Sequence, residues 1–148
     1  LYNRGVYYQD VTSRATIAGF AATTVGDAEA TFTYVERAVT KTSSFRYRIV
    51  KASSKVALGL STTTIKRART QVVVTATVTA SNVVPTGEVT FSLDGKVLKA
   101  VPLAAHDAVA KVTYPKIGNA GQHQISVTYS GDSHLNAATK TVKVTVTA

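Results

Sequence analysis

The chain has 148 residues and a mass of 15.6 kDa, enough for one ordinary domain or two small ones. It contains no cysteine, which excludes a disulfide scaffold, a cysteine-based zinc site and a thiol nucleophile. Its residues are 45% hydrophobic and 17% charged, so a core can form, and its 23 threonines and 22 valines favour strands over helices. No apolar run approaches the roughly 18 residues that span a bilayer, so we expect no membrane insertion.

Basic residues are concentrated in the first half of the chain. Residues 1–70 carry 11 basic and four acidic side chains, against six and four in residues 71–148. Phe45, Tyr47 and Ile49 alternate with two arginines, as on a strand with an outward face. Such a surface either meets an anionic partner, such as a cell-wall polymer or a glycan, or is simply a solvated sheet face. The candidate residues for an anionic partner are Arg46, Arg48, Lys51, Lys55, Lys66, Arg67 and Arg69.

The second half alternates apolar and polar residues with a period of two. This pattern predicts strands at residues 71–80, 88–93, 111–114, 124–129 and 140–147. Between them, Asp94-Gly95 predicts a two-residue hairpin, because glycine accepts a positive φ without steric cost. The inward positions of these strands form the expected core: Val74, Ala76, Val78, Phe91, Val112, Val127, Val142 and Val144.

An internal repeat links the two halves. Residues 27–34 match residues 107–114, and residues 45–49 match residues 125–129 at the same offset. Repeats of this kind predict two copies of one β unit, with a boundary near residues 61–70. We therefore expect one domain at residues 1–61 and a second at residues 62–148.

The second copy resembles a bacterial immunoglobulin-like repeat. The resemblance rests on the order of its strand and turn segments, which are residues 62–64, 73–78, 85–91, 94–95, 127–132 and 139–146. It implies an all-β fold of two tandem immunoglobulin-like β-sandwiches. It also implies a secreted, multi-repeat bacterial surface protein, a module attached to an exoenzyme, or a similar domain on a phage virion.

The first copy lacks the N-terminal strands of its sandwich. Its counterpart of residues 71–86 falls before residue 1, which would leave apolar surface and backbone groups open around Ala30, Phe32 and Tyr34. Upstream sequence in the same protein, a strand donated by a neighbouring chain, or a smaller variant of the fold would each resolve this. We expect these three residues to form a strand-acceptor region for another copy or an adjacent segment.

Catalytic and metal-binding patterns are missing from the sequence. His106, His123 and His134 are expected to be surface or loop residues, and no nucleophile, base and orienting group can be paired. Asp132 follows a Ser-Gly turn, where an aspartate hydrogen-bonds the backbone ahead of it, and the ring of Tyr129 is expected in the core with its hydroxyl on the backbone. We expect no enzyme activity, no cofactor, no metal site and no specific nucleic-acid partner.

The expected function is a structural or adhesive module of a secreted bacterial surface protein or extracellular assembly, located outside the cell or on its surface. Strand complementation between copies would build a filament. The alternatives are an accessory module of a secreted exoenzyme and a decoration or tail module of a phage virion.

Overall fold

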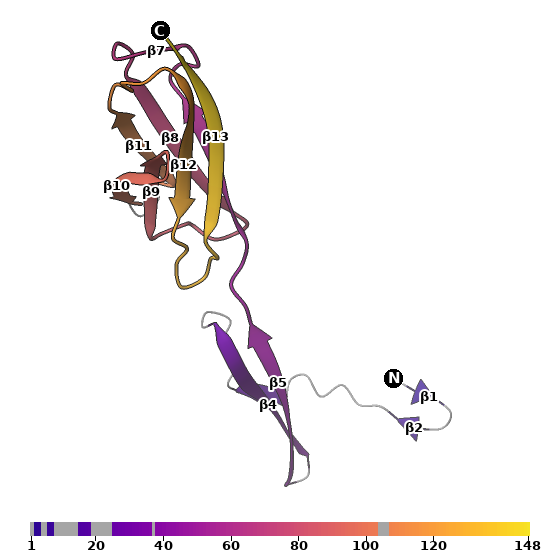
Figure 1. Cartoon of the computed structure of the whole chain (residues 1–148). Helices are drawn as coiled ribbons and strands as arrows, with labels where there is room; N and C mark the ends of the chain where they lie inside the picture. Colours follow the sequence, from indigo (N-terminus) through magenta and orange to yellow (C-terminus); the bar gives the residue numbers. More distant parts are fainter. Residues whose placement is uncertain (1, 4–5, 8–14, 19–24, 37, 104–106) are drawn as a thin grey trace. The chain divides into compact units, whose positions relative to one another are not determined.

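The computed structural model describes residues 2–3, 6–7, 15–18, 25–36, 38–103 and 107–148, and the regular elements among them are all strands. The prediction of an all-β protein is confirmed. The chain divides into two compact units, Leu1–Val50 (unit 1) and Lys51–Ala148 (unit 2), which are described separately (Figure 1).

Unit 2 is a sandwich of two sheets. Its strands are β6 (Ser54–Leu60), β7 (Ile65–Lys66), β8 (Val72–Ala80), β9 (Glu88–Leu93), β10 (Lys96–Pro102), β11 (Val109–Tyr114), β12 (Gly121–Tyr129) and β13 (Ala138–Thr147). One sheet has the order β10-β9-β12-β13-β7 and the other the order β11-β8-β6. All of these pairs are antiparallel except β13 with β7, which run parallel.

The core of unit 2 follows from the period-two pattern, because alternate residues of a strand point to opposite faces. Strand β8 shows this directly, with Val72, Val74, Ala76 and Val78 all buried. Of the eight predicted core residues seven are buried, and Val142 is half-buried against the same cluster. Phe91 is fully buried and meets Tyr114 edge-on, with ring centroids 6.5 Å apart.

The predicted hairpin at Asp94-Gly95 is confirmed. The two residues connect β9 to β10 with Leu93 opposite Lys96, and their φ angles are 50° and 80°. Positive φ at both central residues is the type I′ geometry, which matches the twist of the flanking strands.

Unit 1 contains two separate antiparallel sheets among its described residues. The first pairs β1 (Tyr2–Asn3) with β2 (Val6–Tyr7). The second has the order β3-β4-β5, formed by β3 (Ala15–Ala18), β4 (Gly26–Glu36) and β5 (Val39–Ile49). Strands β4 and β5 pair along their whole length as a long hairpin.

The boundary between the units lies before β6, not near residues 61–62 as expected. Strand β6 pairs with β8 from Ser54–Ala80 to Leu60–Val74, so it belongs to the sandwich of unit 2. Residues 62–148 alone are therefore not a complete sandwich, because β6 forms one edge of the three-stranded sheet. Val56 is buried in the same core.

The sequence match between the halves is not a match of topology. Strands β4 and β5 contain the matched segments of unit 1 and pair directly with each other. Their counterparts β11 and β12 lie in different sheets of unit 2. A second immunoglobulin-like sandwich in the first half is thus not seen in the described residues.

The expected strand-acceptor region also needs correction. Strand β4 is the central strand of its sheet: Phe32 lies opposite Ile17 of β3 and Ser43 of β5, and Tyr34 lies opposite Ala15 and Lys41. Because residues 31–34 are paired on both sides, their backbone has no open edge for a donated strand.

Candidate interaction surfaces

A network of hydrogen bonds centred on Asp132 closes one end of the unit 2 sandwich. Its Oδ2 accepts hydrogen bonds from the backbone N–H and hydroxyl of Thr86, both at 3.0 Å, and from the hydroxyl of Tyr129 at 2.9 Å. Its Oδ1 accepts from the backbone N–H groups of His134 and Leu135, both at 2.8 Å. The predicted turn role of Asp132 is confirmed, and the Tyr129 hydroxyl binds this carboxylate as well as the backbone of Thr86.

The environment of Asp132 stabilises its charged form. Burial alone would raise its pKa, but the N–H groups of Thr86 and His134 and the hydroxyls of Tyr129 and Thr86 outweigh that effect and hold the pKa well below its usual range. Burial and the adjacent carboxylate raise the pKa of Tyr129. Asp132 accepts five hydrogen bonds on its two oxygens and so ties the segment before β9 to the loop after β12. Because these donors occupy both oxygens, the carboxylate has little capacity left to bind a cation.

Two glycines allow these segments to approach each other. Gly87 and Gly131 have φ angles of 92° and 76°. A Cβ atom at Gly87 would lie 2.6 Å from the carbonyl oxygen of Gly131, and one at Gly131 would lie 2.7 Å from that of Leu135. Both positions therefore require glycine for conformation and for space.

A second polar cluster, which sequence analysis missed, joins His123 to the β9–β10 turn. Its Nδ1 lies 2.7 Å from Oδ2 of Asp94, and its Nε2 lies 3.0 Å from the carbonyl oxygen of Asn119. The backbone N–H of Gln124 donates to Oδ1 of Asp94 at 2.8 Å. The His123 side chain is only 12% exposed, so its assignment as an ordinary surface residue was wrong.

The partners of His123 favour its protonated form. A carboxylate and a carbonyl oxygen can only accept, so both ring nitrogens donate when both contacts are hydrogen bonds, and the ring is then cationic. The hydrogen bond to Asp94 raises the pKa of His123, and the same bond lowers the pKa of Asp94. Since neither nitrogen is free to take a proton from a substrate, this pair is not poised as a general base.

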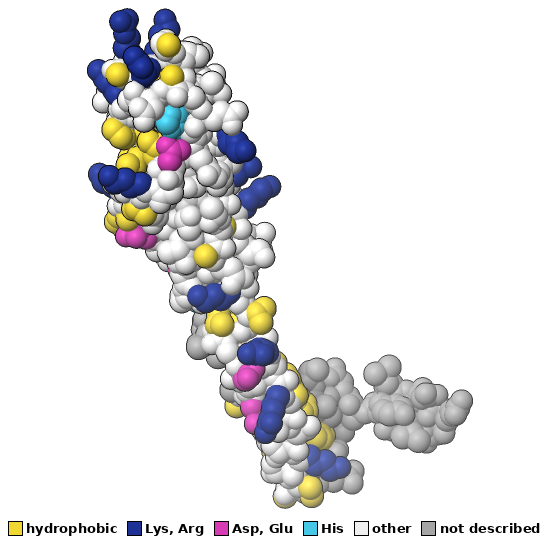
Figure 2. Space-filling view, in the orientation of Figure 1, with side chains coloured by type: hydrophobic (Ala, Val, Ile, Leu, Met, Phe, Trp, Pro, Cys, Tyr) yellow, Lys and Arg dark blue, Asp and Glu magenta, His cyan; other side chains and the backbone are white. Residues whose placement is uncertain are grey.

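The five candidate basic residues of unit 2 lie at its two opposite ends. The Lys51 ammonium donates to the carbonyl of Asp132, and Lys55 lies in β6 at that same end of unit 2. Lys66, Arg67 and Arg69 are exposed at the opposite end, where Arg67 N–H binds the Thr147 carbonyl. Figure 2 shows Lys and Arg side chains gathered at that end, which carries the C-terminus. We call these three residues the basic end.

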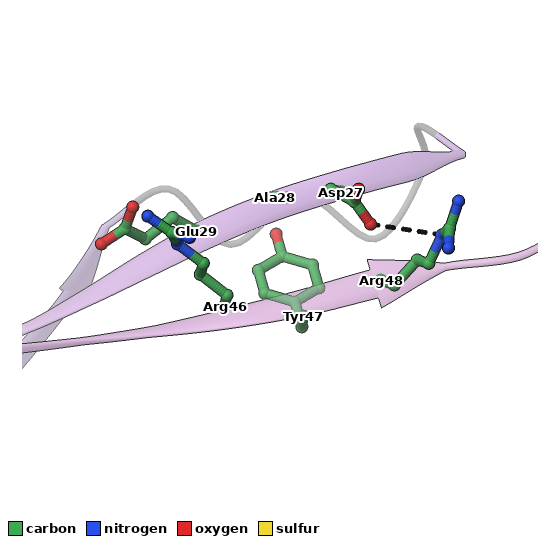
Figure 3. A pocket seen from close by; sticks show the side chains of 6 residues that line it. All are labelled: Asp27, Ala28, Glu29, Arg46, Tyr47 and Arg48. Carbon is green, nitrogen blue, oxygen red and sulfur yellow. Dashed lines mark ion pairs between the residues drawn. The ribbon is translucent and has the colours of Figure 1, made fainter.

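The remaining two candidates, Arg46 and Arg48, lie in unit 1 opposite acidic residues. Arg48 Nε is 3.2 Å from Oδ1 of Asp27, and Arg46 lies across from Glu29 in the β4–β5 register. A shallow depression lined by these four residues also takes in Ala28 and Tyr47, which stand between them along the two strands (Figure 3). Two positive and two negative charges compensate there, so this face is not the cationic surface expected from the sequence.

The opposite face of the same hairpin is mainly apolar, with Lys41 and Ser43 among its residues. Alternation places Ala30, Phe32 and Tyr34 of β4 on one face with Phe45 and Tyr47 of β5. Ala30 is fully buried, whereas Phe32 and Phe45 are 36% and 49% exposed. The Phe45 and Tyr47 ring centroids are 6.1 Å apart. Six of the nine exposed large hydrophobic residues among those described lie in unit 1: Val25, Phe32, Val35, Val39, Phe45 and Val50.

None of the described residues forms a helix long and apolar enough to cross a membrane. The model of one domain family, the bacterial Ig-like domain (group 3), matches residues 50–147. This range agrees with the structural boundary before β6. No curated protein and no solved structure matches the chain.

Proposed function

Because the chain belongs to the bacterial Ig-like domain family (group 3), we propose that it is a structural spacer of a secreted or cell-surface bacterial protein and has no catalytic role of its own. The family match supports a structural module in general. The more specific role as a spacer rests on where the polypeptide enters and leaves unit 2.

The two ends of unit 2 lie at opposite ends of its sandwich, and this observation carries the proposal. The incoming chain is held by Ala52, whose N–H donates to His134 O at 2.8 Å and whose carbonyl accepts from Asn136 N–H at 2.9 Å. The outgoing chain is β13, which runs away from that point for ten residues, or roughly 30 Å, to Thr147 (Figure 1). A domain connected in this way extends a protein by its full strand length.

The same connection suits a module that bears tension. Force applied at Lys51 and Ala148 acts along β6 and β13, which are paired lengthwise with β8 and β12. Every hydrogen bond of these ladders then shares the load, whereas force applied across a ladder breaks its bonds one at a time. The order in which bonds break is set by geometry, so the direction of pulling determines the unfolding force.

Single-molecule pulling of the full chain tests this proposal. Because the chain has no cysteine, thiol handles can be introduced at residues 51 and 148, or at 51 and 81 in the control. Residues 51 and 81 flank the same end of the β6–β8 ladder. Pulling on these two residues therefore separates β6 from β8 and breaks their hydrogen bonds one pair at a time. We expect an unfolding force several times higher for the 51–148 pair. An equal or lower force would contradict the spacer proposal.

A contact with an anionic cell-wall polymer is a second role, favoured by the basic end. Lys66, Arg67 and Arg69 are exposed, and the arginines of unit 1 are compensated by acids. Polyphosphate serves as the probe polymer. Replacing the three basic-end residues by glutamine should abolish its salt-sensitive binding, while the same replacement of Arg46 and Arg48 should not. Equal loss in both variants would contradict this assignment.

Adhesion and self-association, the finer roles expected from the sequence, depend on unit 1. Its apolar exposure supports such a role, but β4 is already paired on both sides. We therefore assign self-association to the strand at the edge of that sheet, β5.

A further inference from the structure

We propose that two copies of the chain associate through β5, antiparallel and edge to edge. The two-fold axis passes between the two Ser44 residues, which lie directly opposite each other. The proposal deepens the self-association assigned to unit 1 and names the contact. It does not depend on the mechanical role of unit 2.

Strand β5 is an edge strand in the part of the chain that the structure describes. It pairs with β4 on one side, and no other described strand pairs with it. All residues from Val39 to Arg46 are exposed, so nothing among them is packed under a second layer. Eleven residues of unpaired edge are a template for another strand.

The occupant need not be acidic, because the two arginines of β5 lie opposite acidic residues of β4, which leaves Lys41 as the β5 cation that faces no acid in that register. Asp27 pairs with Arg48, and Glu29 lies opposite Arg46. A further strand must then satisfy two conditions: it must match the backbone of an eleven-residue edge, and it must place no basic residue opposite Lys41, Arg46 or Arg48. A second copy of β5 meets both conditions in one register.

The faces of the sheet restrict the possible registers. Directly opposed residues in an antiparallel pair share a face. The apolar faces of two copies therefore become continuous only if one residue of β5 lies directly opposite the same residue of the second copy. We name each register by that residue, at which the two-fold axis lies. An axis at residue 46 would place Arg46 opposite Arg46 of the second copy. An axis at residue 47 would place Arg46 opposite Arg48 of the second copy. An axis at residue 45 would oppose Ile49 to Lys41, and one at residue 43 would leave Arg48 and Ile49 outside the ladder.

An axis at Ser44 pairs the whole strand without a like-charge contact. It places Arg46 opposite Thr42 and Arg48 opposite Thr40 on the charged face. On the apolar face it places Ile49 opposite Val39, Phe45 opposite Ser43, and Tyr47 opposite Lys41, a cation–π arrangement. Lys41 is an exposed charge on the aromatic face of an edge strand, where it disfavours unwanted edge pairing. Only the Ser44 register opposes it to an aromatic ring across a fully paired strand.

The resulting contact is isologous and closes on itself. It joins two three-stranded sheets into one of six strands, ordered β3-β4-β5 and then β5-β4-β3 of the second copy. A dimer results, and not the open filament expected from the sequence, because both copies use the same edge.

Cysteine cross-linking of the full chain tests the register. The natural chain has no cysteine, so Ser44→Cys introduces a single thiol whose Cα would lie about 4.5–5.5 Å from its symmetry mate, within disulfide range. Ser43→Cys is the matched control, since its mates would be about 8 Å apart along the diagonal, beyond that range. We expect a disulfide dimer for Ser44→Cys and little for Ser43→Cys. Cross-linking of the control alone, or of neither variant, would overturn the proposal.

A charge substitution at an exposed position gives an independent readout of the dimer. Thr42→Lys would oppose a new cation to Arg46 of the second copy at two symmetric positions, and Thr42→Glu would oppose an anion. Sedimentation equilibrium should show the dimer dissociation constant raised roughly five-fold by Thr42→Lys and lowered by Thr42→Glu.

Thr63→Lys, at an exposed site in unit 2, is the control for net charge and should leave the constant unchanged. A monomeric natural chain at tens of micromolar, an open-ended oligomer, or equal effects of Thr42→Lys and Thr63→Lys would each overturn the proposal.

Discussion

Nδ1 of His123 lies 2.7 Å from the Asp94 carboxylate, which joins the turn between β9 and β10 to the neighbouring strand β12. The carboxylate also accepts the N–H of Gln124, so one side chain holds both the backbone and the ring of β12. Asp94 itself has a positive φ, which an isolated aspartate rarely adopts. This contact therefore adds a tie between the turn and β12 to a conformation that the Asp-Gly pair already favours.

The first prediction concerns the pH dependence of this contact. The pKa of His123 is raised by Asp94, so its stabilising contribution is fully present below the unfolded value near 6.5 and is lost as pH rises through the folded value. The pKa of Asp94 is lowered, so its contribution is present above about 3.9 and is lost as pH falls through its folded value.

Thermal unfolding between pH 5 and 9 measures this effect. We expect the melting temperature of the natural chain to fall across the His123 titration, and Asp94→Asn to flatten that fall. Asparagine tolerates the positive φ of the turn, so this variant removes the charge and keeps the conformation. An unchanged pH slope in Asp94→Asn would show that the pair does not contribute to stability.

The second prediction concerns the core of unit 2. Phe91 is fully buried and packs edge-on against Tyr114, so Phe91→Ala should cost about 3–5 kcal/mol of unfolding free energy. Phe45→Ala in unit 1 is the control, because that ring is 49% exposed, and should cost under about 1 kcal/mol. Denaturant titration of both variants measures the difference. Equal costs would mean that Phe91 does not occupy the core.

Local pattern accounts for what could be predicted from the sequence. Alternation places Val74 and Phe91 inward without knowledge of their partners, and Asp94-Gly95 encodes its own turn geometry. The same alternation exists in residues 55–60, where Val56, Leu58 and Leu60 share one parity, but the predicted boundary at residues 61–62 places it in the first domain. Assigning that strand to unit 2 depends on its pairing with β8, which no local pattern shows.

Contacts between distant segments account for the rest. His123 and Asp94 meet because β9 and β12 pair with Leu93 opposite Ile125, and that register was needed before their proximity could be inferred. The basic residues from 51 to 69 are close in sequence, yet β6 separates Lys55 from Lys66 by its full length. Proximity in sequence therefore misled where an extended strand intervened.

The third prediction concerns the Asp132 network. Asp132→Ala leaves the Tyr129 hydroxyl and four further donors without their acceptor, so it should cost about 2–4 kcal/mol. Tyr129→Phe removes a single donor and should cost about 1 kcal/mol. Because the pKa of Asp132 is lowered, the network contributes fully above about pH 3.9 and is lost as pH falls through the folded value.

Acid unfolding of the natural chain and of Asp132→Asn tests the charge separately from the shape. The amide keeps the size of the side chain but offers one acceptor oxygen in place of two. We expect the natural chain to lose stability below about pH 4 more steeply than Asp132→Asn. Parallel acid profiles would assign the network's contribution to packing and not to the carboxylate charge.

The fourth prediction separates backbone strain from crowding at two glycines. Gly131 and Gly95 have nearly equal φ angles of 76° and 80°, so alanine meets the same conformational penalty, about 1 kcal/mol, at both. At Gly95 the new Cβ would have no atom within 4 Å, but at Gly131 it would lie 2.7 Å from Leu135 O and 2.9 Å from Ala137 N. These contacts are with backbone, which cannot rotate away as a side chain can.

Gly131→Ala should therefore cost at least about 2 kcal/mol more unfolding free energy than Gly95→Ala in denaturant titration. It should also weaken the Asp132 network, because the loop that presents Asp132 has to move. If the two variants unfold at the same denaturant concentration, the loop after β12 accommodates a methyl group and is not the tightly closed end of the sandwich described above.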